Sequence, residues 1–111
     1  MLKSKNFIFD NEREWEQLNE GMRRQVLGYD DQIMMVKVEF LSGGEGAVHS
    51  HAHCQCSYIV SGVFEFNIDG EKRLVKTGDG LYIEPNVSHG VKCLEAGILI
   101  DTFSPVRHDF L

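Results

Sequence analysis

Three histidines and one glutamine near the middle of the chain are the residues whose types and spacing best suit chemistry. His49 and His51 are separated by one residue, Gln55 follows in the same segment, and His89 stands alone after a second glycine-rich turn. Residues at positions i and i+2 of a β-strand point to the same face, so His49 and His51 can bind one ion together. Three imidazole nitrogens and one amide oxygen suit a divalent first-row metal and leave coordination positions open for a substrate.

A carboxylate and a guanidinium near the C-terminus form a second candidate group. Asp101 alternates with Leu99 and Phe103 in an apolar segment, so its carboxylate shares a strand face with apolar side chains. Such a carboxylate is costly unless it is paired or functional, and a core ion pair with Arg107 is the structural alternative. The planar guanidinium of Arg107 can bind a carboxylate through two parallel hydrogen bonds, although a solvated tail residue would look the same in the sequence.

Length and charge restrict the class of protein. A chain of 111 residues suits one domain with a single hydrophobic core. The formal net charge of −6 argues against nucleic acid as a partner, because phosphate binding requires a basic surface. No apolar run approaches the length of a membrane span, and the first residues lack the apolar core of a signal peptide. We therefore expect a cytoplasmic protein that binds neither nucleic acid nor a membrane.

The three cysteines, Cys54, Cys56 and Cys93, cannot all pair with one another. Cys54 and Cys56 flank Gln55 on a predicted strand, so their thiols point away from the face that carries the amide. We expect small, reduced thiols, with a redox or metal-linked role as the alternative.

Alternating segments separated by glycine turns predict an all-β protein. Residues 33–40 and 63–68 place apolar side chains at every second position, and Asp69-Gly70 predicts a hairpin between the second segment and residues 73–75. Many short strands with regular turns favour a β-sandwich or barrel. Further strands are expected over residues 80–83, 90–94 and 97–103, and a helix only over residues 11–19.

The histidine spacing, taken together with the glycines around it, resembles the first sequence motif of the cupin family. This motif runs over residues 43–62, from Gly43 to Gly62, and its expected ligands are His49, His51 and Gln55. Glutamine stands here in place of the glutamate that is usual in the family. The resemblance implies a single cupin domain over residues 1–111, a double-stranded β-helix or jelly-roll barrel, with an N-terminal arm over residues 1–20.

The second cupin motif, over residues 78–93, is a looser match and supplies His89. Glu84 replaces a proline of the family pattern, Asn86 replaces a glycine, and Cys93 stands where asparagine is often found. None of these departures removes an expected metal ligand.

Residues 21–29, 32–38 and 98–111 are similar to one group of small cupins that act on the sugars released from pectin and alginate. This resemblance implies conversion of 4,5-unsaturated monouronates to linear 4-deoxy-5-keto uronates. It implies one divalent transition metal per chain (Ni, Zn, Mn or Fe), a small-molecule uronate substrate and a homodimer. The implied metal ligands are His49, His51, Gln55 and His89, and the implied catalytic residues are Asp101, Phe103 and Arg107.

Two other functions remain open at this point. A cupin dioxygenase would use the same ligands with a redox metal, but the C-terminal segment over residues 101–105 disfavours it. A cupin that binds a sugar or metal without catalysis is the second alternative, and the lack of a DNA-binding domain weakens it as a sensor of gene regulation.

Overall fold

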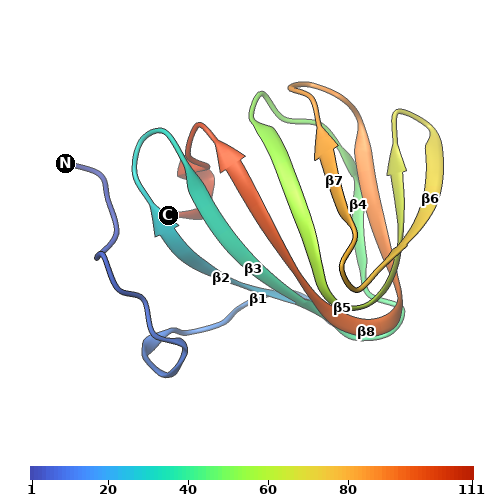
Figure 1. Ribbon diagram of the computed structural model, residues 1–111, viewed down its shortest axis with the longest axis horizontal. Helices are drawn as coiled ribbons and strands as arrows, with labels where there is room; N and C mark the ends of the chain where they lie inside the picture. The colour runs from blue at the N-terminus through green and yellow to red at the C-terminus, as the bar shows by residue number, and fades with distance from the viewer.

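The computed structural model describes residues 1–111 and shows one twisted sheet that curls back on itself as a barrel (Figure 1). The strand order is β1-β2-β3-β8-β5-β6, and β4 and β7 add to β8 and β5 respectively. All pairs are antiparallel, so the prediction of an all-β barrel is confirmed. The strands are β1 (Glu16–Asn19), β2 (Met22–Tyr29), β3 (Met34–Phe40), β4 (Glu45–His49), β5 (Cys54–Ile68), β6 (Glu71–Lys76), β7 (Gly80–Ile83) and β8 (His89–Ser104).

The two longest strands, β5 and β8, bend together at the lower end of the barrel in Figure 1 and so contribute to both of its walls. Gly62 has a positive φ of 90°, and a Cβ atom there would lie 2.6 Å from the carbonyl oxygen of Glu95. A Cβ atom on Gly97 would collide with the backbone of Ser61. Only glycine permits both the backbone conformation and this close approach.

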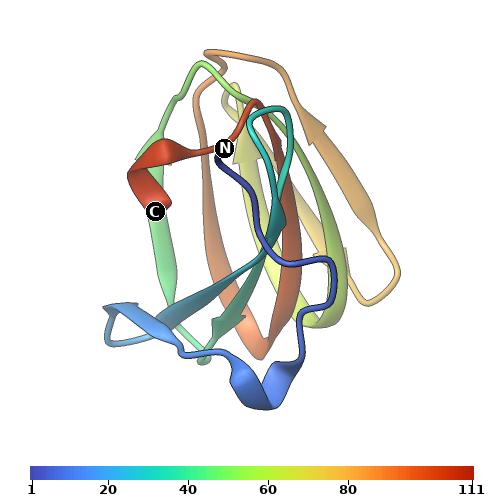
Figure 2. The same ribbon diagram turned by 90° about the vertical axis from the view of Figure 1, so that its left-hand side faces the viewer.

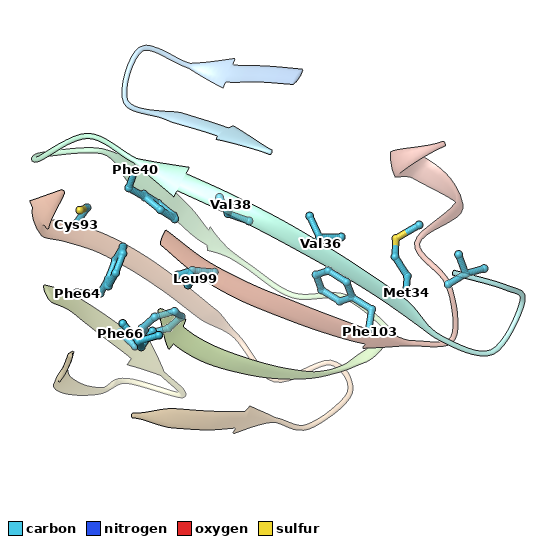
Figure 3. Close-up of a cluster of buried hydrophobic side chains, with 11 residues drawn as sticks. Met34, Val36, Val38, Phe40, Phe64, Phe66, Cys93, Leu99 and Phe103 are labelled. Carbon is cyan, nitrogen blue, oxygen red and sulfur yellow. The ribbon is translucent and has the colours of Figure 1, made fainter. Parts of the chain in front are cut away.

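Apolar side chains fill the barrel interior, as Figure 3 shows. Phe40 packs edge-to-face on Phe64, with ring centres 5.1 Å apart, and Cys93 lies beside them at one end of the core. Phe103 lies opposite Met34 at the other end of the core. The alternation predicted for β3 is confirmed, because its buried members are Met34, Val36, Val38 and Phe40.

The hairpin predicted at Asp69-Gly70 is confirmed. The two residues have φ angles of 52° and 84° and connect β5 to β6. Both angles lie in the left-handed region, which asparagine, aspartate and glycine tolerate best. The strands predicted over residues 90–94 and 97–103 are parts of the single strand β8, because Gly97 bends the strand without ending it.

The helix predicted over residues 11–19 is wrong. The structure has a short 3-10 turn, η1 (Asp10–Glu12), followed by strand β1. Glu16 pairs across the strands with Arg24 of β2, so a tertiary ion pair and the β-ladder override the local helix preference. Strand β2 itself was not predicted as a separate strand.

The N-terminal segment runs along the outside of the barrel, as Figure 2 shows. Lys3 forms an isolated bridge to Asp30, and the Trp15 ring lies 4.1 Å from the Arg23 guanidinium carbon on the outer face of β2. The structure contains no helix with the length and apolar character needed to cross a lipid bilayer.

Candidate metal centre and active site

The three histidines of the two sequence motifs meet at one end of the barrel. His49 ends β4 and lies directly across from His89, the first residue of β8. Their ring centres are 4.5 Å apart, and the ring of His51 lies 4.8 Å from that of His89. The potential ligand atoms of all three lie within 4.8 Å of one another. This spacing is compatible with one shared metal ion.

His51 reaches this cluster from a different element than the sequence suggested. Their spacing predicted one strand for His49 and His51, but β4 ends at His49 and His51 lies in the turn before β5. The expectation of a common strand is therefore wrong. The turn brings the second imidazole to the same point, and the amide of Asn86 donates a 2.7 Å hydrogen bond to the His51 carbonyl.

Each histidine is oriented by a backbone carbonyl. The Nδ1 atoms contact the oxygen of Ala47 from His49 (2.8 Å), of His53 from His51 (2.8 Å) and of Val87 from His89 (2.9 Å). A carbonyl only accepts hydrogen bonds, so these contacts favour a proton on each Nδ1 and a free lone pair on each Nε2. Burial lowers the pKa of both His51 and His89, which favours the neutral form that a metal requires.

Gln55 is the fourth candidate donor and provides a test of whether a cation fits. The residue is only 6% exposed, and its Nε2 donates to Ser57 Oγ (3.1 Å) and Asp101 Oδ1 (3.2 Å). This leaves Gln55 Oε1 facing the Nε2 atom of His51 at 3.0 Å. With the His51 proton on Nδ1, two lone pairs face each other, an arrangement that a bound cation satisfies. The residues present therefore fit a divalent metal.

Asp101 lies directly behind this donor set on β8 and lines the cavity. Its Oδ1 accepts a short 2.6 Å hydrogen bond from Ser57 Oγ in addition to the one from Gln55, whereas Oδ2 receives none from the protein. Burial raises the pKa of Asp101 to about 6, although the Ser57 and Gln55 hydrogen bonds oppose this shift by favouring the carboxylate. One oxygen is thus anchored, and the other is available for proton transfer.

Arg107 follows β8 and packs over two aromatic rings. Its guanidinium carbon lies 5.1 Å from the Phe103 ring centre and 4.3 Å from that of Phe110. The ion pair with Asp101 that the sequence left open is not formed, because Arg107 donates two hydrogen bonds to Asp109 (3.1 and 2.9 Å). These hydrogen bonds lower the pKa of Asp109. Only 12% of the Arg107 side chain is exposed, so it is not a solvated tail residue.

A cavity of about 210 Å³ joins these groups. Its apolar wall includes Val36, Val38 and Leu99, which face the barrel interior from β3 and β8. Its polar members are Arg24, His49, Gln55, His89, Asp101 and Arg107. A small molecule with both apolar faces and oxygen substituents matches such a lining.

Three contributors to the site were not found from the sequence. Ser57 follows Gln55 at i+2 on β5, so strand alternation could have placed it on the same face. Arg24 alternates with inward-facing apolar residues of β2, a signal that depends on recognising β2 as a strand. Phe110 belongs to the 3-10 turn η2 (His108–Phe110), and no local pattern indicates its packing on Arg107.

The cysteines lie outside the metal centre. All three thiols are free, and Cys56 is exposed on the outer face of β5, as the alternation around Gln55 predicted. The Cys54 thiol contacts the carbonyl oxygen of Ser104 at 3.4 Å. Cys93 is buried in the core, and burial raises the pKa of its thiol.

Comparisons with known proteins agree with this architecture. The family model described as a cupin domain matches residues 36–102. The pectin degradation protein KdgF of Dickeya dadantii (strain 3937) is 46% identical over 109 residues, which cover 96% of this chain and 99% of that protein. An RmlC-like cupin from Shewanella frigidimarina is 45% identical, with a TM-score of 0.96 and full coverage of both chains. KdgF from a Halomonas species is 34% identical, with a TM-score of 0.92 and coverage of 97% of this chain and 100% of that one.

Proposed function

The chain belongs to the cupin family, and we propose that it is a metal-dependent enzyme that opens the ring of 4,5-unsaturated monouronates. The products are linear 4-deoxy-5-keto uronates, and the substrates are the sugars that pectin and alginate lyases leave behind. The observation that carries this proposal is one small cavity whose lining includes His49 and His89 of the histidine cluster together with Asp101 and Arg107. The similarity to proteins named for pectin degradation supports the choice of substrate class.

The reaction is an isomerisation that needs one base, one acid and a group that binds the substrate carboxylate. The hydroxyl proton at C1 is removed, the bond between C1 and the ring oxygen breaks, and an aldehyde forms at C1. The ring oxygen becomes the oxygen of an enolate at C5, and a proton added at C4 converts the enolate to the 5-keto group. No oxidant or reductant is consumed.

The side chains around the cavity match these needs. Asp101 Oδ2, which has no hydrogen bond from the protein, accepts the C1 hydroxyl proton in this proposal and returns a proton to C4. Arg107 binds the substrate carboxylate, and Phe103 provides a flat wall for the ring. A divalent cation held by His49, His51, Gln55 and His89 would polarise a substrate oxygen as a Lewis acid.

The test of this function is a direct assay. Purified protein is mixed with unsaturated monouronate, and loss of the double-bond absorbance is compared with the spontaneous rate. We expect acceleration that is the same under nitrogen and under air, because no oxygen is consumed. Absence of acceleration in metal-loaded protein would overturn the proposal, and a requirement for air would favour a dioxygenase.

The metal site gives a separate prediction. The wild-type protein should contain one divalent ion per chain, and a His49→Ala, His51→Ala double variant should contain almost none, because half of its donor atoms are gone. Elemental analysis measures both proteins, and His108→Ala serves as a control because His108 is exposed outside the cluster. Equal metal content in the double variant and the control would contradict the assignment.

We also propose that the protein is a homodimer, formed through the outer face of the sheet. Tyr58 of β5 and Tyr82 of β7 are 53% and 56% exposed, and Cys56, Met35 and Val60 extend this face. Two copies that cover this face would bury aromatic surface that is costly to leave in water. Sedimentation at micromolar concentration should show one dimeric species that reductant does not change.

A charge on this face distinguishes dimerisation from chance aggregation. Tyr58→Glu should shift the species to monomer, whereas Leu74→Glu on β6 should not, although Leu74 is 64% exposed. A wild-type protein that is monomeric at all concentrations, or a dimer unaffected by Tyr58→Glu, would refute this interface.

A further inference from the structure

Arg24 is a charged residue on the inner wall of the barrel. In the pairing of β2 with β3, Arg24 lies opposite Val38, and its neighbour Val26 lies opposite Val36. Arg24 therefore shares the inward face of β2 with apolar side chains, and it lines the same cavity as the histidine site. Only 13% of its side chain is exposed. A guanidinium in such a place is costly unless its hydrogen-bond donors are used.

The protein itself uses only part of this donor capacity. Glu16 on β1 accepts two hydrogen bonds, from Arg24 Nε (3.3 Å) and Nη2 (3.0 Å). A guanidinium has five N–H donors, so three of them have no partner in the protein. The Glu16 carboxylate is 54% exposed, which places this ion pair at the outer rim of the cavity. The remaining N–H groups are available to a ligand inside it.

Arg24 and Arg107 are joined by one aromatic ring. The guanidinium carbon of Arg24 lies 3.6 Å from the centre of the Phe110 ring, and that of Arg107 lies 4.3 Å from it. Each arginine also uses Nε and Nη2 to hold one carboxylate, Glu16 for Arg24 and Asp109 for Arg107. The two side chains thus have the same arrangement, with two donors fixed and three unused.

We propose that Arg24 is a second substrate-binding arginine, which grips the uronate carboxylate together with Arg107, and that Glu16 and Phe110 position it. This inference rests on the proposed function and extends it to a residue outside the two cupin motifs. The protein carries a net charge of −6, so an anionic sugar needs local positive charge at the cavity. Two planar guanidinium groups on one ring provide that charge and fix the direction of the carboxylate.

The experiment compares two neighbouring arginines. Arg24→Gln removes the inward guanidinium, and Arg23→Gln removes the next one along β2, which faces outward and pairs with Glu39 at 2.7 Å. Both variants lose one positive charge and one ion pair. For Arg24→Gln we expect KM for unsaturated monouronate to rise about 10- to 100-fold, with kcat changed far less. Arg23→Gln should match the wild type in both constants.

Binding of non-reacting sugars gives a second readout. Calorimetry with D-galacturonate should show a similar loss of affinity in Arg24→Gln. The much weaker binding of neutral D-galactose should be unchanged, because it lacks the carboxylate. Arg24→Lys keeps the charge without the planar fork and should recover part of the affinity. It also replaces Arg24→Gln in every comparison if the latter does not fold.

The outcomes separate this inference from the proposed function. Wild-type activity with unchanged KM and galacturonate affinity in the Arg24 variants would overturn the role of Arg24 alone. Equal losses for galactose and galacturonate would also overturn it, because the contact would then be to hydroxyl groups. A wild-type protein that neither binds nor converts uronates would overturn the function on which it rests.

Discussion

Replacing Asp101 by asparagine is expected to lower the turnover of unsaturated monouronate by about 10²- to 10⁴-fold, the range typical for removal of a general acid or base. Asparagine keeps the size of the side chain and can still contact Ser57 and Gln55, so the donor set for the metal should stay in place. The measurement is kcat at saturating substrate, with metal content determined on the same samples. Asp10→Asn, a surface change at a carboxylate paired with Lys37, should leave kcat unaltered.

The stability of the Asp101→Asn variant distinguishes a catalytic carboxylate from a structural one. In the metal-free fold the pKa of Asp101 is about 6, above its ordinary value of 3.8, so the folded state binds this proton more tightly than the unfolded chain. Ionisation therefore destabilises the fold increasingly as the pH rises from about 4 to about 6, and the full cost remains above that range. The melting temperature of metal-free Asp101→Asn at pH 7 should equal or exceed that of the wild type. A large drop in melting temperature with retained turnover would show a structural role.

Replacing Arg107 by alanine is expected to lower kcat/KM by about 10²- to 10³-fold. The pair proposed here joins Arg107 to the substrate carboxylate. Truncating one member of a buried charge pair commonly costs several kcal/mol of binding free energy, part of which reflects the partner left unpaired. Arg107→Lys should restore only part of the activity, since an ammonium lacks the planar fork and packs differently on Phe103 and Phe110. Initial-rate kinetics over a range of substrate concentrations measure all three proteins.

Arg73→Ala is the matched control for this change. Arg73 also pairs with a nearby carboxylate, Glu71, but its side chain is 77% exposed on β6 and does not line the cavity. Surface ion pairs of this kind contribute little, so kcat/KM should be unchanged. If Arg107→Ala behaves like Arg73→Ala, the carboxylate contact is wrong. If it only lowers the melting temperature, Arg107 serves to anchor the C-terminal turn.

The cluster of His49, His51 and His89 was predictable from the sequence because its spacing resembles that of the cupin motifs, yet the reason offered for that spacing was partly incorrect. His49 and His51 converge through a turn and not through strand alternation. Strand β3 was predictable because each apolar residue alternates with a polar or exposed one over its full length. Strand alternation therefore predicts the direction of side chains inside a strand but not beyond its last residue, where a turn decides the direction of the next side chain.

Other parts of the fold and of the candidate site depend on contacts between residues that are distant in sequence, which no local pattern reveals. Residues 11–19 have helix-favouring composition, but Glu16 is held in β1 by its pairing with Arg24. The sequence around Ser57 is that of an ordinary strand. Its role appears only in the fold, where its Oγ lies 2.6 Å from Oδ1 of Asp101, a residue distant in sequence. Phe110 packs against the guanidinium groups of Arg24 and Arg107, which belong to separate parts of the chain. These features arise from tertiary packing, which composition and periodicity do not report.

The pairing of β5 with β8 also sets the order of events when the chain folds. This ladder extends from Ile68 opposite His89 to Cys54 opposite Ser104, and its neighbour joins Met34 to Phe103, so completing both ladders takes the freedom from long stretches of chain. Folding should accordingly be slow for a chain of this size. The candidate ligands come from β4, the following turn and the first residues of β5 and β8, and His49 meets His89 only when β4 pairs with β8. A cation that finds its full donor set only in the closed barrel will prolong the lifetime of the native state and do little to speed its formation.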